Sequence, residues 1–162
     1  MDTFTIEDFY QISEISSDET LTPLEQQTKT LQLARPDLSE EEIEELTIDE
    51  FEEITKGLEF SLDGKIENSF TLDNIEYTLK GNSKDFDFTV RQMLTIQNKI
   101  KNDQLRYLHW MMAVLYDCDV FDVNKRAEVF LNNLPVKRAL PFVKILMEKY
   151  NPDAEILERS NS

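Results

Sequence analysis

Residues 38–54 read LSEEEIEELTIDEFEEI, and this stretch contains two helix starts in close succession. Ser39 and Thr47 each stand three residues before a glutamate. This is the spacing of a capping box, in which the hydroxyl accepts a hydrogen bond from a free backbone N–H of the first turn and the glutamate reaches back to the N–H of the cap. The stretch predicts helices near 39–45 and 47–56, and it favours a mainly helical fold.

The same helix-start pattern occurs at three other places. Thr5 and Thr22 precede acids at the third helical position, and Thr89 precedes Gln92 in the same way. These patterns predict helices near 5–15, 22–34 and 89–101. In four of the five starts, an apolar residue before the cap is placed to pack on the fourth helical residue as a hydrophobic staple. The pairs are Phe4 with Phe9, Leu38 with Ile43, Leu46 with Phe51, and Phe88 with Met93.

The last third of the chain also has helical patterns. Apolar residues at a helical period predict a helix over 104–116, and Asp122 is placed to cap a helix over 123–132. Residues 134–150 predict one more helix, with a break or kink at Pro141, because proline lacks the N–H that the helical ladder needs.

The middle of the chain has a strand pattern instead. Residues 58–62 alternate between apolar and polar side chains and are followed by a possible turn at Asp63-Gly64. Residues 70–72 and 75–79 alternate in the same way on either side of a possible turn at Asp73-Asn74. Alternation broken by short turns is typical of antiparallel strands. We therefore predict an α+β fold that is mainly α, with a helical domain around a small central antiparallel β-hairpin or sheet of two or three strands.

These patterns divide the chain into an acidic helical half (1–60), a β-hairpin (58–81), a nearly neutral helical half (82–150) that packs with the first as one domain, and a polar tail (151–162). Matching helix starts in the two halves are offset by 84 residues (Phe4 and Phe88) and 88 residues (Leu46 and Leu134). A duplication that produced two pseudo-repeated helical halves would explain these offsets. Caps that recur wherever helices begin would explain them equally well, and both interpretations stay open.

The chain is 40% apolar, which is enough to build a core. We expect this core to draw on apolar residues from all the predicted elements, namely Phe9, Ile12, Leu31, Phe51, Ile54, Phe60, Tyr77, Met93, Leu108, Met112, Leu115, Phe130 and Ile145.

Charge is distributed very unevenly along the chain. Residues 1–60 contain 18 Asp and Glu against 3 Lys and Arg, a net charge of −15, whereas residues 61–162 contain 15 acids and 14 bases. A surface this acidic repels nucleic-acid phosphates and anionic lipid, so we expect no direct binding to nucleic acid and no membrane association. The asymmetry favours an interaction protein over an enzyme.

Few residues could carry out catalysis. His109 is the single histidine and lies in an apolar helical stretch, where a packed, hydrogen-bonded role is favoured over a general base. Cys118 is the single cysteine, so it forms no intrachain disulfide and fits a reducing cytosol. Asp117, Asp119 and Asp122 lack the further ligands of a calcium loop and are interpreted as a solvated helix start. We expect no catalytic residue, no cofactor and no metal, and we do not expect an enzyme.

Two surfaces are candidates for partner binding. The first is an acidic ridge of Glu40, Glu41, Glu44, Glu45, Asp49 and Glu52. It is either a solvated face that keeps the protein soluble, or a binding surface, which would receive a basic partner or mimic the spacing of nucleic-acid phosphates. The second is a set of aromatic residues in the neutral half, Tyr107, Trp110, Phe121, Phe130 and Phe142. They are interpreted either as the main partner contact or as core.

The stretch Thr20–Phe60, TLTPLEQQTKTLQLARPDLSEEEIEELTIDEFEEITKGLEF, resembles the small acidic tail-assembly chaperones of bacteriophages. Those proteins place an apolar helix before a Ser/Pro-Glu-Glu-apolar element and a Leu-led helix, which here are Leu31–Ala34, Leu38–Ile43 and Leu46–Phe51. The second half has a strand pattern at Ile75–Leu79, a helix start at Thr89, the apolar run Leu108–Tyr116, and Arg126–Phe130 before Leu134–Val136. With these features it resembles phage-encoded proteins from virion-gene neighbourhoods. The chain differs from the chaperones in its length and in its central hairpin.

This resemblance implies a non-catalytic role in phage particle assembly, as a transient chaperone or a minor virion component. Its partners would be other phage structural proteins, and its location would be the host cytoplasm during assembly or the virion. A second hypothesis comes from the acidic ridge alone. In that interpretation, the protein is an acidic decoy that mimics nucleic acid and inhibits a host DNA-binding enzyme.

Overall fold

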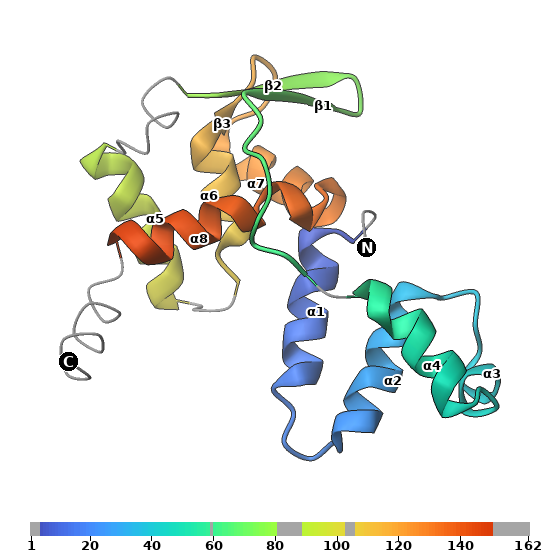
Figure 1. Ribbon diagram of the computed structural model, residues 1–162. Coiled ribbons are helices and arrows are strands. Elements are labelled where there is room, and N and C mark those ends of the chain that lie inside the picture. Colours follow the sequence, from blue (N-terminus) through green and yellow to red (C-terminus); the bar gives the residue numbers. More distant parts are fainter. Residues whose placement is uncertain (1–3, 59, 81–88, 103–105, 151–162) are drawn as a thin grey trace, which may run out of the picture.

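The computed structural model describes residues 4–58, 60–80, 89–102 and 106–150. Within these ranges the chain is mostly helical, with eight α-helices and a small three-stranded antiparallel sheet (Figure 1). The predicted α+β, mainly α fold class is therefore confirmed. No helix in the described ranges combines the length and the apolar run needed to cross a bilayer.

The N-terminal helices begin where the capping boxes predict. They are α1 (Ile6–Ser16), α2 (Pro23–Ala34), α3 (Glu40–Glu44) and α4 (Ile48–Thr55), followed by the short 3-10 helix η1 (Lys56–Leu58). Each of the four α-helices has both hydrogen bonds of the box. At α4, for example, the Glu50 backbone N–H donates to Thr47 Oγ1 (3.2 Å) and the Thr47 N–H donates to the Glu50 carboxylate (2.9 Å).

Helices α2, α3 and α4 form a small lobe with a hydrophobic cluster of its own. Its buried residues are Leu31, Ile43 and Phe51, one from each helix. The half-buried staple residues Leu38 and Leu46 pack against this cluster, as the helix-start patterns predict. We call residues 22–56 the acidic lobe, and Figure 1 shows its helices to one side of α1.

The sheet confirms the predicted hairpin but not its full extent. Strand β1 (Ser69–Leu72) pairs with β2 (Ile75–Leu79), and the two loop residues Asp73 and Asn74 have positive φ angles of 50° and 65°. Positive φ at both positions is the requirement of a type I′ hairpin turn, which Asp and Asn tolerate.

The third strand differs from the prediction. It is β3 (Tyr116–Asp117), whose residues pair with Leu79 and Thr78 of β2. The alternating residues near 58–62 form no strand in the described ranges; Leu58 and Phe60 instead pack against the main core from the segment that joins α4 to β1. A two-residue strand is too short to produce an alternating pattern, and alternation alone does not supply a neighbouring strand.

The C-terminal half contains α5 (Val90–Asn102), α6 (Leu108–Leu115), α7 (Val123–Asn133), the 3-10 helix η3 (Val136–Arg138) and α8 (Leu140–Tyr150). Thr89 and Gln92 form the capping box of α5, and Asp122 caps α7, both as predicted. The helix predicted over 104–116 is shorter: α6 begins at Leu108 and ends at Leu115, because Tyr116 already belongs to β3, and residues 104–105 lie outside the described residues. The predicted break at Pro141 is wrong in position: the break precedes α8, and Pro141 lies in its first turn, where no backbone N–H is needed.

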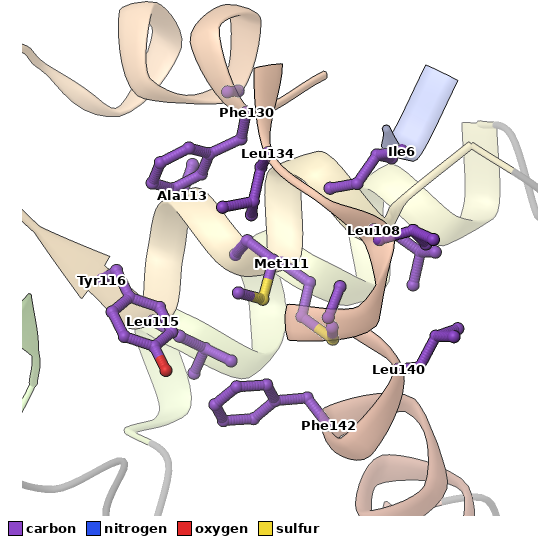
Figure 2. Close-up of a cluster of buried hydrophobic side chains, with 14 of the residues drawn as sticks. Ile6, Leu108, Met111, Ala113, Leu115, Tyr116, Phe130, Leu134, Leu140 and Phe142 are labelled. Atoms are coloured by element: carbon purple, nitrogen blue, oxygen red, sulfur yellow. The ribbon is translucent and has the colours of Figure 1, made fainter. Parts of the chain in front are cut away.

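The main core surrounds the C-terminal part of α6, whereas His109 and Trp110 in its first turn are half-buried. Residues 111–116 are all buried, and Figure 2 shows Met111 and Leu115 among Ile6 of α1, Phe130 of α7 and Phe142 of α8. A helix that is apolar all round is typical of a protein interior. The first helix of the acidic half also connects to this core through its backbone: the Ile6 N–H donates to Leu134 O (3.2 Å) and the Val136 N–H donates to Phe4 O (2.8 Å).

Most of the predicted core is confirmed. Ile12, Leu31, Phe51, Tyr77, Leu108, Met112, Leu115 and Phe130 are buried. Phe9, Ile54, Phe60, Met93 and Ile145 are half-buried. Phe60 connects two of the staple residues, because its ring lies 5.9 Å from that of Phe4 and 5.1 Å from that of Phe9, centroid to centroid.

The division into the predicted ranges and the duplication stay predictions, and residues 81–88 and 151–162 lie outside the described residues.

Candidate protein-binding surface on the acidic lobe

The acidic ridge is exposed, as its helical spacing predicts. Glu40, Glu41, Glu44, Glu45, Asp49 and Glu52 are all exposed on α3, α4 and the turn between them. Residues 39–55 contain nine acids and no Lys or Arg, and all nine are exposed. Of these nine, only Glu53 forms an ion pair among the described residues, at 3.3 Å from Lys56. The lobe therefore carries a dense negative charge that its own bases leave largely uncompensated.

Two of the nine acids have a structural role. The carboxylate of Glu42 accepts a hydrogen bond from the Ser39 N–H (2.8 Å), and that of Glu50 accepts one from the Thr47 N–H (2.9 Å). These charges also lie at helix N-termini, where the helix dipole stabilises them. The other seven acids take no part in the capping boxes, and they are exposed to solvent.

Two open hollows lie between these acids. One, of about 690 Å³, is lined by Ser39, Glu41, Glu42, Glu45 and Leu46. The other, of about 530 Å³, is lined by Leu46, Asp49, Glu50, Glu53 and Ile54. Because Leu46 lines both, we treat them as one feature and call it the acidic groove.

The floor of the acidic groove is apolar. Leu46 and Ile54 are half-buried, so one part of each side chain packs on the cluster of Leu31, Ile43 and Phe51 while another part faces the groove. The acidic groove thus combines an apolar floor with a carboxylate rim, an arrangement that the ridge alone does not reveal.

A larger hollow of about 810 Å³ lies on the other side of α4, between α1 and α2. Its lining includes Ile12 and Phe60, with the side chains of Gln26, Gln27 and Thr30 around them. The side-chain amide of Gln26 already has a hydrogen-bond partner, because it donates to the backbone oxygen of Asp18 (3.0 Å). Glu52 and Lys56 also line this hollow, and their opposite charges offset each other, so its net charge selects no particular partner.

For two of the five aromatic residues singled out in the neutral half, the structure supports the core interpretation over partner contact. Phe130 and Phe142 are 0% exposed and lie in the main core, so they cannot contact a partner in this fold (Figure 2). Tyr107, Trp110 and Phe121 are half-buried. The reason is that α6 lies at the centre of the fold and α7 and α8 cover it, so the aromatic residues of these covering helices point inward.

His109 has a packed, hydrogen-bonded role, as its apolar surroundings favour. The hydroxyl of Tyr10 on α1 lies 2.8 Å from His109 Nδ1, and the His109 backbone N–H donates to the same hydroxyl (3.3 Å). Arg106 lies over the Tyr10 ring at 5.2 Å and forms an ion pair with Glu14 at 2.9 Å. Burial raises the pKa of Tyr10 above its ordinary value, which keeps the hydroxyl protonated.

Sequence reasoning missed the role of Arg126. Its guanidinium is buried and donates from Nε and Nη2 to Ala113 O (3.1 and 2.9 Å) and from Nη1 to Phe121 O (2.8 Å). Nη1 also lies 3.1 Å from the carboxylate of Asp117. The side chain therefore holds the C-terminal end of α6 against α7. A basic residue next to Ala127 on the buried side of an amphipathic helix is the one sequence signal that could have indicated this.

The remaining polar candidates have local contacts in the described ranges. Cys118 is half-buried, and its thiol lies 3.8 Å from the Phe121 oxygen. Asp122 caps α7, which agrees with its interpretation as a helix start. No group of three or more His, Cys, Asp or Glu in the described residues is arranged to hold a metal ion.

Comparison with protein-family models, with curated proteins and with solved structures gives no significant match to this chain.

Proposed function

We propose that this protein is a non-catalytic bacteriophage assembly or virion-associated protein that works by binding another phage structural protein. The resemblance of Thr20–Phe60 to tail-assembly chaperones supports this role. The place of action would be the host cytoplasm during assembly, or the finished particle if the protein stays bound.

The observation that carries the proposal is the construction of the acidic lobe. The lobe has its own buried cluster of Leu31, Ile43 and Phe51, which Leu58 joins to the main core around α6, and it presents nine exposed acids without a Lys or Arg between residues 39 and 55. These acids lie on α3, α4 and the turn between them, so a partner that binds them contacts the lobe rather than the residues buried around α6. Complementary charge on the partner would accelerate association and select against acidic competitors.

Co-expression of the full chain with single structural proteins encoded near its gene tests the proposal. We expect one of them to co-purify as a defined complex, and we expect this complex to weaken as salt rises from about 50 to about 500 mM, because exposed charges are screened. A set of structural proteins that includes the tail and portal components but yields no complex would contradict the assembly role. Mass spectrometry of purified particles then distinguishes a transient chaperone from a virion component.

The acidic-decoy hypothesis remains a second candidate, because the seven acids outside the capping boxes form a surface with one sign of charge. A nucleic-acid mimic occupies the DNA site of its target, so duplex DNA and the protein should compete for one host enzyme. An assembly partner with a basic segment would also bind DNA, so competition by DNA is expected of both candidates. Inhibition of DNA binding by a purified host enzyme would support the decoy, whereas no inhibition together with a complex with a phage structural protein would support assembly.

A further inference from the structure

We propose that the acidic groove is the docking site for a basic amphipathic helix of the partner, whose Lys and Arg contact the rim while its apolar side chains cover Leu46 and Ile54. This inference rests on the proposed function for the identity of the partner as a phage protein. It adds the chemistry of the segment that binds and the residues that receive it.

The apolar floor requires apolar side chains on the occupant. Leu46 and Ile54 are only half-buried by the cluster beneath them, and the groove leaves part of both side chains without a protein neighbour. Covering this remaining surface is favourable, because apolar area leaves water. A wholly polar polycation or a flat duplex would leave the floor uncovered.

The rim requires a basic occupant. Glu41 and Glu45 line one hollow and Asp49 and Glu53 line the other, and no Lys or Arg lines either one. Among the described residues the one ion pair of these four acids is the exposed contact of Glu53 with Lys56 (3.3 Å). An uncharged segment would remove water from these carboxylates without replacing its hydrogen bonds, which costs free energy. Lys or Arg would replace the lost solvation and add attraction, and Arg would do so with two hydrogen bonds to one carboxylate.

The spacing of the rim acids favours a helix as the basic segment. Glu41 and Glu45 are four residues apart, and so are Asp49 and Glu53, so within each pair the charges lie about one helical turn apart. Bases at four-residue spacing on a partner helix have the same separation. Apolar residues on the adjacent stripe of that helix would then meet the floor, which is the usual way an amphipathic helix lies in a groove.

The peptide test uses the full chain and a synthetic helical peptide about four turns long, with Leu on one face and Lys on the flanking positions. A matched peptide keeps every Lys but has Ser in place of each Leu. Fluorescence anisotropy should show the Leu peptide binding at least about tenfold more tightly than the Ser peptide, because only the first covers Leu46 and Ile54. Equal affinity for the two peptides would show an unspecific charge attraction and would overturn the proposal.

The chain offers a matched pair of variants for the same assay. Asp49→Lys with Glu53→Lys reverses two rim charges, and Glu40→Lys with Glu44→Lys reverses two exposed charges of equal spacing that line neither hollow. The rim variant should lose about tenfold in affinity for the Leu peptide, because two close attractive charge contacts become repulsive. The control variant should lose about twofold, because the protein as a whole becomes less negative.

Circular dichroism of both variants shows whether the lobe keeps its helices, and none of the four residues belongs to a capping box. Equal losses in the two variants would place the binding outside the groove and overturn the proposal. Peptide binding with the expected pattern, together with no complex in the co-expression experiment, would leave the docking site intact and refute the phage assembly role instead. A second copy of this chain as the occupant would appear as a dimer that the Leu peptide dissociates, and that result would also overturn the proposal.

Discussion

The hydroxyl of Tyr10 lies 2.8 Å from Nδ1 of His109, and the two residues are 99 positions apart in the chain. This contact joins α1, the first helix of the acidic half, to α6 at the centre of the main core. The His109 backbone N–H donates to the same hydroxyl (3.3 Å), so this one oxygen has two hydrogen-bond partners on α6.

Tyr10→Phe should lower the free energy of unfolding by about 1–3 kcal/mol, because it leaves the His109 N–H and Nδ1 without their hydroxyl partner. Urea denaturation followed by circular dichroism measures this. Tyr77→Phe is the matched control: Tyr77 is equally buried, but its hydroxyl has no hydrogen-bond partner in the described structure. We expect Tyr77→Phe to be neutral or stabilising, and equal destabilisation by both variants would contradict the assigned role of the Tyr10 hydroxyl.

Gly64→Ala should destabilise the protein by about 1 kcal/mol, because a Cβ atom at residue 64 would lie 2.8 Å from Cγ of Pro141 and the backbone would have to move away. Gly57 is the matched control, since a Cβ there meets no atom within 4 Å and neither glycine has a positive φ. Gly57→Ala should be neutral or stabilising by up to about 1 kcal/mol, because alanine lowers the conformational entropy of the unfolded chain. Thermal unfolding of the two variants side by side checks the prediction, and an unchanged Gly64→Ala protein would refute it.

Arg126→Met should cost about 3 kcal/mol of stability, because the carbonyl oxygens of Ala113 and Phe121 lose their charged donor. Lys125→Met on the same helix removes an exposed ion pair with Glu128 (3.3 Å) and should change stability by less than about 0.5 kcal/mol. Chemical denaturation distinguishes the two effects. Similar small changes in both variants would show that the buried guanidinium is dispensable.

The protein should lose stability at alkaline pH, between about pH 10 and pH 12. Burial raises the pKa of the Tyr116 hydroxyl to about 12 from its ordinary value of 10.0. As pH rises, the unfolded chain therefore releases this proton at a lower pH than the folded protein does. The stabilising contribution of the buried, protonated hydroxyl is complete below about pH 10 and is lost as pH rises through about 12. Tyrosinate absorbance and circular dichroism measured over the same titration test this, and Tyr116→Phe should weaken the pH dependence. A loss of structure well below pH 10 would require another titrating group.

Two parts of the structure lie within the reach of sequence reasoning because their interactions are local. A capping box joins residues three apart, so the starts of α1 to α5 are visible from Thr5, Thr22, Ser39, Thr47 and Thr89. The Asp73-Asn74 turn is similarly local, and it places Leu72 opposite Ile75. The exposure of the acidic ridge also follows from the sequence, since nine carboxylates on two short helices cannot be buried without partners.

Only the tertiary structure decided which apolar surfaces face each other. Aromatic residues occur both at binding surfaces and in cores, so the sequence alone did not assign Phe130 and Phe142. They belong to the core because α7 and α8 pack over α6. Strand β3 exists because the end of α6 passes beside β2, and Arg126 is buried because Ala113 O and Phe121 O converge on it. The apolar floor of the acidic groove arises in the same way, where α3 and α4 meet over Leu31. These features depend on contacts between distant residues, and periodicity along the chain does not encode the partner of a buried face.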